Sequence, residues 1–385
     1  MGKNPMIPLF QVAMAPTVLS QLAQVLTPRA DGSFYIGEGP RCAELETRLP
    51  EILGHERILL VNSGTSAIKL ALHLAGARKG TEVISTPQTC LLTNTAILET
   101  GATIVWADVD RVTGNIDPAD VLSKVSSKTV AIVAVDWSGR VCDFATLRKY
   151  TRGISLIEDA AHAFGANAPA RGDYICYSFQ AIKHFTTVDG GGLVCPGLAL
   201  HERGRLLRWA GLDRTRGDSM RCYQRVSEAG FKMQLNDVLA TIGLANLADV
   251  KGRIETSRAN ARHFFQALDC LAHVVIPPYD AGASWWFYPI QVSSPVRFES
   301  FMAERGIAVG QVHSRNDVNP CFDSAIKSEL PGVEYFSAHQ TNVPCGWFID
   351  EAARERIVLA IRAWAELEEA AWEPAPATSE HAKVG

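Results

Sequence analysis

The stretch RILLVNSGTSAIKLALHLA, residues 57–75, contains the change of pattern on which the fold prediction rests. An arginine and four aliphatic residues come first, as is typical of a strand that is buried on both faces. From Thr65 onward, apolar residues recur at helical spacing, as at Ile68, Leu72 and Ala75. A strand followed so soon by a helix indicates one unit of a fold in which strands and helices alternate.

The same alternation continues to about residue 195. The short apolar runs that we predict as strands are residues 57–61, 82–85, 103–107, 130–135, 154–158, 174–179 and 192–195. Strands that alternate with helices form a mostly parallel sheet with helices on both faces. We therefore predict an α/β fold with a mostly parallel seven-stranded sheet. The spacing is too irregular for a barrel of eight strand–helix units.

The pattern changes after about residue 200, where longer helical segments and fewer strands follow. A length of 385 residues fits two or three domains. We predict a large domain over residues 1–250, a smaller α+β domain over residues 251–372, and a polar, proline-rich tail over residues 373–385. The elements expected beyond residue 200 are helices over 201–209, 298–305 and 350–371, a long helix or a helical pair over 236–268, a loop over 211–228 and a strand over 285–292.

The composition excludes several classes of protein. The net charge is −4, which gives no electrostatic reason to expect a nucleic-acid or membrane-surface partner. No run of 18 apolar residues and no secretory leader occurs, so we expect neither a membrane span nor export. The nine cysteines are scattered and form no Cys-x-x-Cys pair. This argues against a disulfide framework and against a metal site, and it favours a cytoplasmic location.

Polar clusters follow two of the predicted strands, at the edge where open α/β sheets bind ligands. The first is Asn62-Ser-Gly-Thr-Ser66, whose hydroxyls and free N–H groups at a helix start can hold a phosphate. The second places Asp159 at the end of a strand, with His162 three residues later. Each cluster by itself also fits a plain helix cap. Neither is a P-loop or a GxGxxG fingerprint, which disfavours ATP and NAD.

A third cluster, from Tyr177 to Gly192, places Lys183 beside Ile182 and Phe185. A lysine is by default a solvated surface group. Among apolar neighbours, however, its pKa falls and it can attack a carbonyl as an amine. The glycines at the end of the cluster let the chain pass close to a ligand.

Taken together, the three clusters predict pyridoxal 5′-phosphate as the cofactor. A phosphate-binding turn at Ser63, a carboxylate at Asp159 and a buried lysine at Lys183 follow one another along the chain, as this cofactor requires. The carboxylate pairs with the pyridine nitrogen, and the lysine holds the aldehyde as a Schiff base. A fourth segment, residues 230–237, gains a function only in combination with these three.

These motifs resemble the sugar aminotransferases of the DegT/DnrJ/StrS family, which have the aspartate aminotransferase fold (fold type I of the pyridoxal phosphate enzymes). The resemblance runs from about Ile7 to Ile361. The stretches that carry it are NSGTSAI at 62–68, GATIVWADVD at 101–110, EDAAHAFGA at 158–166 and SFQAIKHFTTVDGG at 178–191.

The resemblance implies a role for each matching position. Lys183 forms the internal aldimine and later shuttles the proton between the cofactor and the substrate. Asp159 pairs with the pyridine nitrogen, and His162 touches the phenolic oxygen of the cofactor. The residues that hold the phosphate are Gly64, Thr65 and Ser178.

The family also implies an obligate homodimer, because a Gly-Tyr-Asn-Tyr-Arg-like phrase from the neighbouring subunit completes its site. Here the phrase reads Gly230-Phe-Lys-Met-Gln234, so Lys232 stands in place of the usual Asn and can bind the phosphate as an ammonium. Two further departures occur. Cys90 stands where an aromatic residue normally stacks on the cofactor ring, and residues 311–319 are unlike the commoner members.

The resemblance implies a ping-pong aminotransferase in amino-sugar biosynthesis, for a polysaccharide or an antibiotic. L-glutamate leaves its amino group on the cofactor, with pyridoxamine 5′-phosphate as the intermediate, and a keto-sugar takes it up. The expected keto-sugar is a nucleotide-linked keto-deoxysugar. The substrate candidates are His184, His313, Arg315 and Asn316, and for the last three a solvated loop is an equal alternative.

Three alternatives remain open at this point. A pyridoxal phosphate-dependent sugar dehydratase is disfavoured by Lys183, because resembling dehydratases carry His there. A regulatory or structural dimer would keep the fold without turnover. A cyclitol ketone is a further possible acceptor for an aminotransferase.

Overall fold

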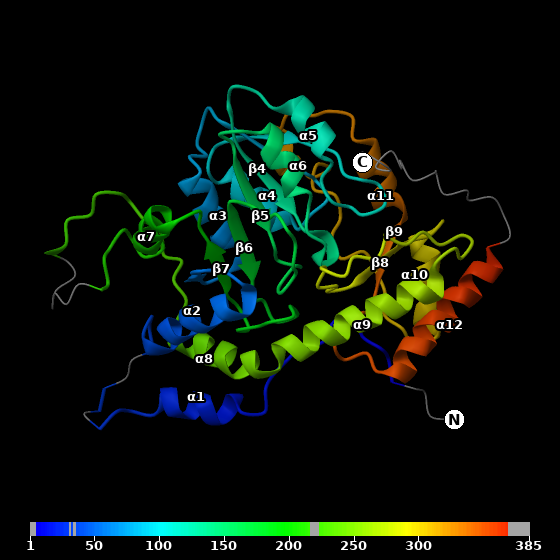
Figure 1. The fold of residues 1–385 in the computed structure, drawn as a ribbon, viewed down its shortest axis with the longest axis horizontal. Helices are drawn as coiled ribbons and strands as arrows, with labels where there is room; N and C mark the ends of the chain where they lie inside the picture. The colour runs from blue at the N-terminus through cyan, green and yellow to red at the C-terminus, as the bar shows by residue number, and fades with distance from the viewer. Residues whose placement is uncertain (1–4, 31, 34–35, 216–222, 369–385) are drawn as a thin grey trace.

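The computed structural model describes residues 5–30, 32–33, 36–215 and 223–368 of the chain. A seven-stranded sheet with helices on both faces forms its larger part, and helices around a two-stranded sheet lie beside it (Figure 1). The predicted α/β fold with a mostly parallel seven-stranded sheet is confirmed.

The order of the large sheet is β1-β7-β6-β5-β4-β2-β3. Its strands are β1 (Leu59–Val61), β2 (Glu82–Ser85), β3 (Thr103–Trp106), β4 (Thr129–Val135), β5 (Ser155–Asp159), β6 (Tyr174–Ser178) and β7 (Gly191–Val194). The pairs from β3 to β6 are parallel, whereas β7 is antiparallel to β1 and β6. The carboxyl ends of β2, β4, β5 and β6 therefore meet at one edge, where ligands bind in such sheets.

Twelve helices are found in the described part of the chain. They are α1 (Val18–Leu26), α2 (Pro40–Leu53), α3 (Gly64–Leu74), α4 (Leu91–Leu98), α5 (Pro118–Lys124), α6 (Phe144–Tyr150), α7 (Leu198–Leu207), α8 (Asp237–Asn246), α9 (Val250–Leu268), α10 (Pro295–Glu304), α11 (Pro331–His339) and α12 (Glu351–Leu367). All helices predicted from the sequence are present, and of the two alternatives for residues 236–268 the helical pair is found, as α8 and α9. Helices α1, α2, α5, α6 and α11 were not predicted. Two of them, α5 and α6, have only seven residues and so show little periodicity.

The sheet is buried on both faces, as the apolar character of its strands requires. On β4, Ala131 and Val133 pack into the cluster under α3 and α4, whereas Ile132 and Ala134 pack into the cluster under α5 and α6. The alternation follows from the two-residue period of a strand.

The second part of the chain has its own apolar core. Strands β8 (Tyr288–Gln291) and β9 (Gln340–Val343) pair antiparallel, and β9 was not predicted. Helix α9 extends from α8 beside the large sheet toward α10 and α12 (Figure 1). The N-terminal segment belongs to this part as well, because Ile7 bridges Ile307. The predicted domain boundary near residue 250 stays a prediction, and the predicted tail lies outside the described residues.

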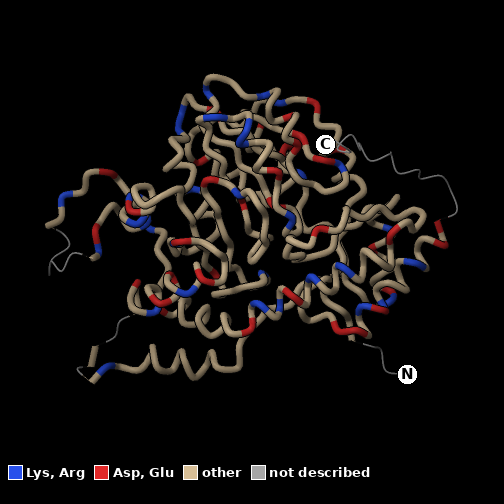
Figure 2. The backbone as a smooth tube through the Cα atoms, in the orientation of Figure 1, with Lys and Arg blue, Asp and Glu red and all other residues tan. Residues whose placement is uncertain are grey.

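Basic and acidic residues are interspersed over most of the described backbone, whereas α1 carries none (Figure 2). This distribution agrees with the small net charge of −4. Within the described residues, no helix has both the length and the apolar character needed to cross a membrane.

One turn joins the large sheet to the segment that precedes β8. Ser138 and Gly139 follow β4, and their carbonyl groups accept hydrogen bonds from the N–H groups of Trp286 (2.9 Å) and Ser284 (3.0 Å). Gly139 has φ +98°, in the region that favours glycine. A Cβ at this position would lie 2.8 Å from the carbonyl oxygen of His162. The approach of the two segments therefore requires glycine.

We predict that Gly139→Ala lowers the free energy of unfolding by about 3 to 5 kcal/mol, because backbone strain and steric overlap add. The matched control is Gly153→Ala, since Gly153 has φ +82° but open space around its missing side chain. The control should lose only about 1 to 2 kcal/mol. Urea unfolding measures both variants, and equal losses would show that the contact with Ser284 and His162 is not tight.

Candidate active site

A cavity of about 510 Å³ lies at the carboxyl edge of the sheet. Side chains from the ends of β1, β5 and β6 and from the starts of α3 and α4 line it, together with residues 311–313 of the second part of the chain. The structure thus brings most of the predicted site residues together. Those that line the cavity are Ser63, Gly64, Thr65, Cys90, Asp159, His162, Ser178, Lys183 and His313.

The close approach of α3 to β6 forms one end of the cavity. Ser63 caps α3, because its Oγ accepts a hydrogen bond of 3.0 Å from the N–H of Ser66. A Cβ on Gly64 would lie 2.9 Å from the Cβ of Ser178, so only glycine lets the two segments meet. The helix start, with the hydroxyls of Thr65 and Ser178 beside it, offers N–H and O–H donors to an anion.

Asp159 is the last residue of β5 and is buried. Its carboxylate accepts hydrogen bonds from the hydroxyl of Thr93 (2.8 Å) and from the N–H of Ala161 (3.1 Å). Burial raises the pKa of Asp159, while these two hydrogen bonds and the charge of Lys183 act against the rise. The hydroxyl of Thr89 in turn donates to that of Thr93 (3.2 Å). Thr93 was not predicted from the sequence, because no local pattern indicates which distant residue a threonine inside a helix contacts.

Lys183 is buried between the sheet and the second part of the chain. Its Nζ lies 3.3 Å from the ring centroid of Trp286. Burial lowers the pKa of Lys183 to about 7, and the nearby Asp159 and Cys90 oppose this change. An amine with such a pKa is partly unprotonated at neutral pH and can act as a nucleophile.

His162 and His313 form a stacked pair at the cavity wall. Their rings are 5.4 Å apart and inclined by 10°, and their Nε2 atoms are separated by 3.3 Å. Burial and the charge of Lys183 lower the pKa of both imidazoles, to about 4 for His313, so both are neutral at physiological pH. The Nδ1 atom of His162 has no hydrogen-bond partner among the described residues.

Cys90 precedes α4 and contributes to the cavity wall. Burial raises the pKa of its thiol, which is therefore neutral. Its stacking on a cofactor ring stays a prediction.

Lys232 does not line the cavity of its own chain. It is exposed, and its Nζ lies 4.4 Å from the ring centroid of Trp209, with which it pairs through the backbone. The backbone of the next residue, Met233, accepts a hydrogen bond of 2.7 Å from the N–H of Asn62. Lys232 is thus held on the surface beside the chain segment that leads into α3.

Three of the four substrate candidates also lie outside the cavity wall. His184 is buried, and burial together with the charges of Lys183 and Arg258 lowers its pKa to about 3. Arg315 forms a two-pronged ion pair with Asp317 at 2.8 and 2.6 Å.

Asn316 joins the loop that carries His313 to α4. Its Oδ1 accepts a hydrogen bond of 2.8 Å from Asn94, and its Nδ2 donates to the carbonyl oxygen of Thr89 (2.9 Å). The side chain is buried, and an amide fully used in this way stabilises the loop.

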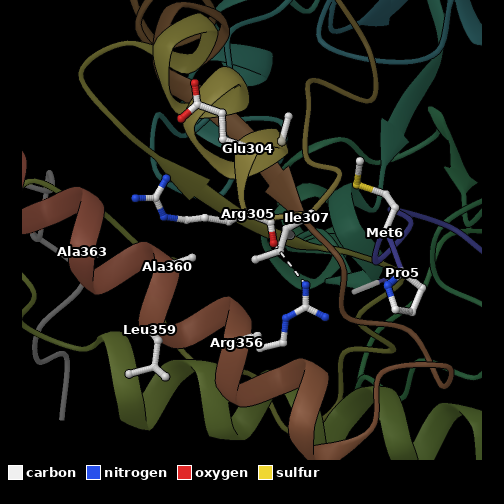
Figure 3. A pocket seen from close by; sticks show the side chains of 11 residues that line it. Pro5, Met6, Glu304, Arg305, Ile307, Arg356, Leu359, Ala360 and Ala363 are labelled. Atoms are coloured by element: carbon white, nitrogen blue, oxygen red, sulfur yellow. Dashed lines mark hydrogen bonds between the residues drawn. The ribbon is translucent and has the colours of Figure 1, made fainter. Parts of the chain in front are cut away.

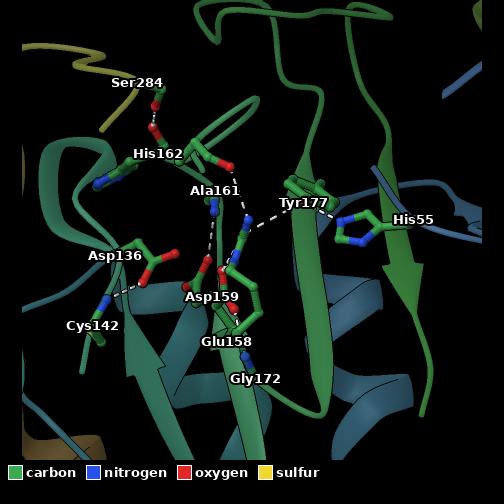
Figure 4. Close-up of polar contacts among 12 residues, drawn as sticks. His55, Asp136, Cys142, Glu158, Asp159, Ala161, His162, Gly172, Tyr177 and Ser284 are labelled. Carbon is green, nitrogen blue, oxygen red and sulfur yellow. Dashed lines mark hydrogen bonds and ion pairs between the residues drawn. The ribbon is translucent and has the colours of Figure 1, made fainter. Parts of the chain in front are cut away.

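A buried ionic network lies behind Asp159 (Figure 4). Glu158 is fully buried and forms an ion pair with Arg171. The carboxyl group of Asp136, at the end of β4, accepts a hydrogen bond of 2.9 Å from the N–H of Cys142. Burial and the nearby charge of Glu158 raise the pKa of Asp136 well above its usual value. One arginine thus serves two buried carboxyl groups, which is why the pKa of Asp136 shifts toward the neutral form.

A larger cavity, of about 930 Å³, lies elsewhere, between α10, α12 and the N-terminal segment (Figure 3). Arg305, Arg356 and Leu359 are among its lining residues, and the figure shows their side chains around it. None of the predicted site residues, all of which the structure describes, borders this cavity. Size alone therefore does not identify the active site.

The residues of the smaller cavity fit pyridoxal 5′-phosphate. The start of α3, which only a glycine allows to approach Ser178, suits the phosphate. Asp159 suits the protonated pyridine nitrogen, because a buried carboxylate needs a cation partner. Lys183 provides the amine that this cofactor requires. Three chemically different groups thus line one cavity in the order along the chain that the sequence predicted.

Comparisons with known proteins agree with this chemistry. The profile of the DegT/DnrJ/EryC1/StrS aminotransferase family matches residues 19–362. The spore coat polysaccharide biosynthesis protein SpsC of Bacillus subtilis (strain 168) is 32% identical over 277 residues, which are 68% of this chain and 70% of that protein. The structure of AtS13 from Actinomadura melliaura is similar with a TM-score of 0.87 and 38% identity, covering 94% of this chain and 99% of AtS13. The sugar aminotransferase CalS13 from Micromonospora echinospora gives a TM-score of 0.86 and 35% identity, covering 93% of this chain and 100% of CalS13.

We predict that Thr93→Val weakens the binding of pyridoxal 5′-phosphate by about 10- to 100-fold, because Asp159 loses a hydrogen bond to its charged form. Thr93→Ser keeps the hydroxyl and should bind within about threefold of the parent protein. Equilibrium titration of the cofactor-free chain, followed by absorbance, measures the affinities. Equal affinity of the valine and serine variants would contradict a role of the Thr93 hydroxyl.

Proposed function

The chain belongs to the DegT/DnrJ/EryC1/StrS aminotransferase family, and on that premise we propose that it transfers an amino group from L-glutamate to a nucleotide-linked keto-deoxysugar. Membership makes it a sugar aminotransferase that depends on pyridoxal phosphate. When bound, this cofactor supplies an aldehyde that takes up the amino group and a ring that accepts electrons during the transfer. The donor, the acceptor and their order of reaction are the parts that we propose.

The observation that carries the proposal is the presence of Lys183 and Asp159 in one cavity. The pKa of about 7 means that the Lys183 amine can take up a proton and release it again near neutral pH. It is therefore suited to move a proton at the substrate carbon in both directions of a transfer. Asp159 is suited to hold the ring nitrogen and so to orient the cofactor. A sugar dehydratase is disfavoured, because Lys183 occupies the position of its His.

The lining of the cavity supports a partly deoxygenated acceptor. Beside the polar groups, it consists of apolar side chains that offer no hydrogen bonds to hydroxyl groups. These are Leu9, Phe10, Ile68, Leu92, Val135, Ala161, Ile182, Val312 and Trp286, whose indole N–H is already bonded to Ile182. A single cavity of about 510 Å³ also supports the ping-pong order, in which donor and acceptor use the same space in turn. A nucleotide carrier for the sugar rests on the family membership.

We further propose that two copies of the chain complete each other's sites. Lys232 is exposed and outside the cavity of its own chain, so its ammonium is available to the phosphate in a second subunit. Leu91 and Leu92 are 45% and 53% exposed, and Leu92 borders the cavity. Apolar side chains at the rim of a site favour coverage by a partner surface.

The proposed compartment is the cytoplasm. Among the described cysteines, all are free thiols, including the buried Cys42, Cys142, Cys176 and Cys345. Unpaired thiols in this number favour a reducing environment.

We expect L-glutamate to change the absorbance of the bound cofactor and to release one 2-oxoglutarate per site. A nucleotide-linked keto-deoxysugar should then restore the original spectrum. Lys183→Ala should slow both steps by about a thousandfold or more, because the proton-transferring amine is lost. The matched control is Lys327→Ala, which removes an exposed lysine and should leave both steps unchanged. No response to any amino acid would contradict the proposed transfer. If only a free cyclitol ketone restored the spectrum, the acceptor would be a cyclitol ketone and not a nucleotide-linked sugar.

Mixing two variants tests the shared site. At limiting cofactor, Lys183→Ala lacks the amine and Lys232→Ala binds the phosphate weakly, so each alone should have little activity. Refolding them together should restore about a quarter of the sites, because half of random dimers are hybrids with one intact site each. Activity that stays at the average of the two variants would place Lys232 in its own chain's site or away from any site.

A further inference from the structure

Lys183 contacts the face of an aromatic ring. Its Nζ lies 3.3 Å from the ring centroid of Trp286, and no carboxylate of the described residues forms an ion pair with it. A tryptophan face attracts an ammonium group more strongly than other aromatic rings do, and more strongly in a dry site than at the surface. The contact is therefore suited to hold the amine in one place.

Trp286 is itself fixed on several sides. Its indole N–H donates a hydrogen bond of 2.8 Å to the carbonyl oxygen of Ile182, the residue directly before Lys183. Phe10 stacks on the ring at 4.5 Å with an angle of 20°, and His162 lies 4.5 Å from it. The ring is thus hydrogen-bonded to the backbone directly before the lysine, which holds it within reach of the lysine side chain.

The backbone before Trp286 is strained. Trp285 has φ +54°, a conformation that costs about 1 to 3 kcal/mol for a bulky residue and persists only where the surroundings hold it. Here the surroundings are the hydrogen bonds of Ser284 and Trp286 to the turn at Ser138 and Gly139. The two neighbouring tryptophan side chains consequently point into different environments. Trp285 packs in the core of the second part, and Trp286 lines the cavity.

We propose that Trp286 is a positioning residue, which keeps the amine of Lys183 against its ring whenever that amine is not bonded to the cofactor. A free lysine side chain has many rotamers, and ordering it costs free energy. A fixed ring reduces this cost and retains the amine at the cavity, ready to move a proton or to bond again. The inference rests on the proposed role of Lys183.

The groups around the amine make it possible to test the proposal by the direction in which the pKa of Lys183 shifts when Trp286 is replaced. Asp159 on β5 and Cys90 before α4 favour the charged form, whereas burial disfavours it. Burial and the charge of Lys183 lower the pKa of His162, His184 and His313, which are therefore neutral neighbours. If Trp286 were only an apolar wall, its loss would admit water and raise the pKa of the lysine. If its face binds the ammonium, its loss lowers that pKa.

The experiment measures how fast the cofactor-free full-length chain captures pyridoxal 5′-phosphate, by absorbance, between pH 5.5 and 9. The midpoint of the rate reports the Lys183 amine, and the ionisation of the cofactor is common to all variants. Trp286→Leu should lower the midpoint by about 0.5 to 1.5 pH units, and Trp286→Phe by less, because phenylalanine is the weaker ring. The control Phe322→Leu shortens a buried aromatic side chain that packs on Trp106 and is not part of the cavity lining, and it should leave the midpoint unchanged.

A midpoint that rises or stays constant in Trp286→Leu overturns the proposal. Circular dichroism verifies the fold, and if the leucine variant does not fold, the direction of the shift in Trp286→Phe decides. The Lys183→Ala variant gives the background absorbance change, which does not depend on the Lys183 amine. Failure of the parent protein to capture the cofactor would instead contradict the proposed function, so the two failures are distinguishable.

Discussion

The structure depends on keeping a lysine and a carboxylate ionisable inside an apolar cavity. Burial acts against the charged forms of both Lys183 and Asp159. Each charge is therefore compensated by groups that are fixed beforehand: the hydroxyl of Thr93 and the N–H of Ala161 at the carboxylate, and the ring of Trp286 at the amine. The surrounding elements are arranged so that these few groups reach the cavity.

The sheet makes this arrangement rigid. Asp159 ends β5, and the next layer behind it consists of Glu158, Arg171 and Asp136, which connect the ends of β4 and β5 to the segment before β6. These side chains contain two acids and one arginine, so that burial and the charge of Glu158 favour the neutral form of Asp136. A network of this kind tolerates few alternative packings. The network thereby holds Asp159, the residue that would pair with the cofactor, in one position.

The second part of the chain contributes to the site by three contacts, two of which come from one loop. Trp286 arrives through the strained backbone at Trp285, His313 stacks on His162, and Asn316 connects the loop to α4. The first segment of the chain adds Phe10, which packs on Trp286. The cavity is therefore not a property of the large sheet alone, although the sheet carries the residues with the clearest chemistry.

The sequence by itself was enough to predict the seven strands, the mostly parallel sheet and Lys183, Asp159 and Gly64 as site candidates, because each of these features has a local sequence pattern. An apolar run indicates a buried strand, small hydroxyl residues before a helical pattern indicate a helix cap, and a lysine among apolar residues indicates a desolvated amine. Only the tertiary structure decided that Thr93, Trp286 and Phe10 reach the cavity, and that His184 and Asn316 do not line it. Their roles depend on which distant segments meet, and a one-dimensional pattern does not contain the path of the chain. The same polar side chain can bind a substrate or stabilise a loop, and only its neighbours in space distinguish the two.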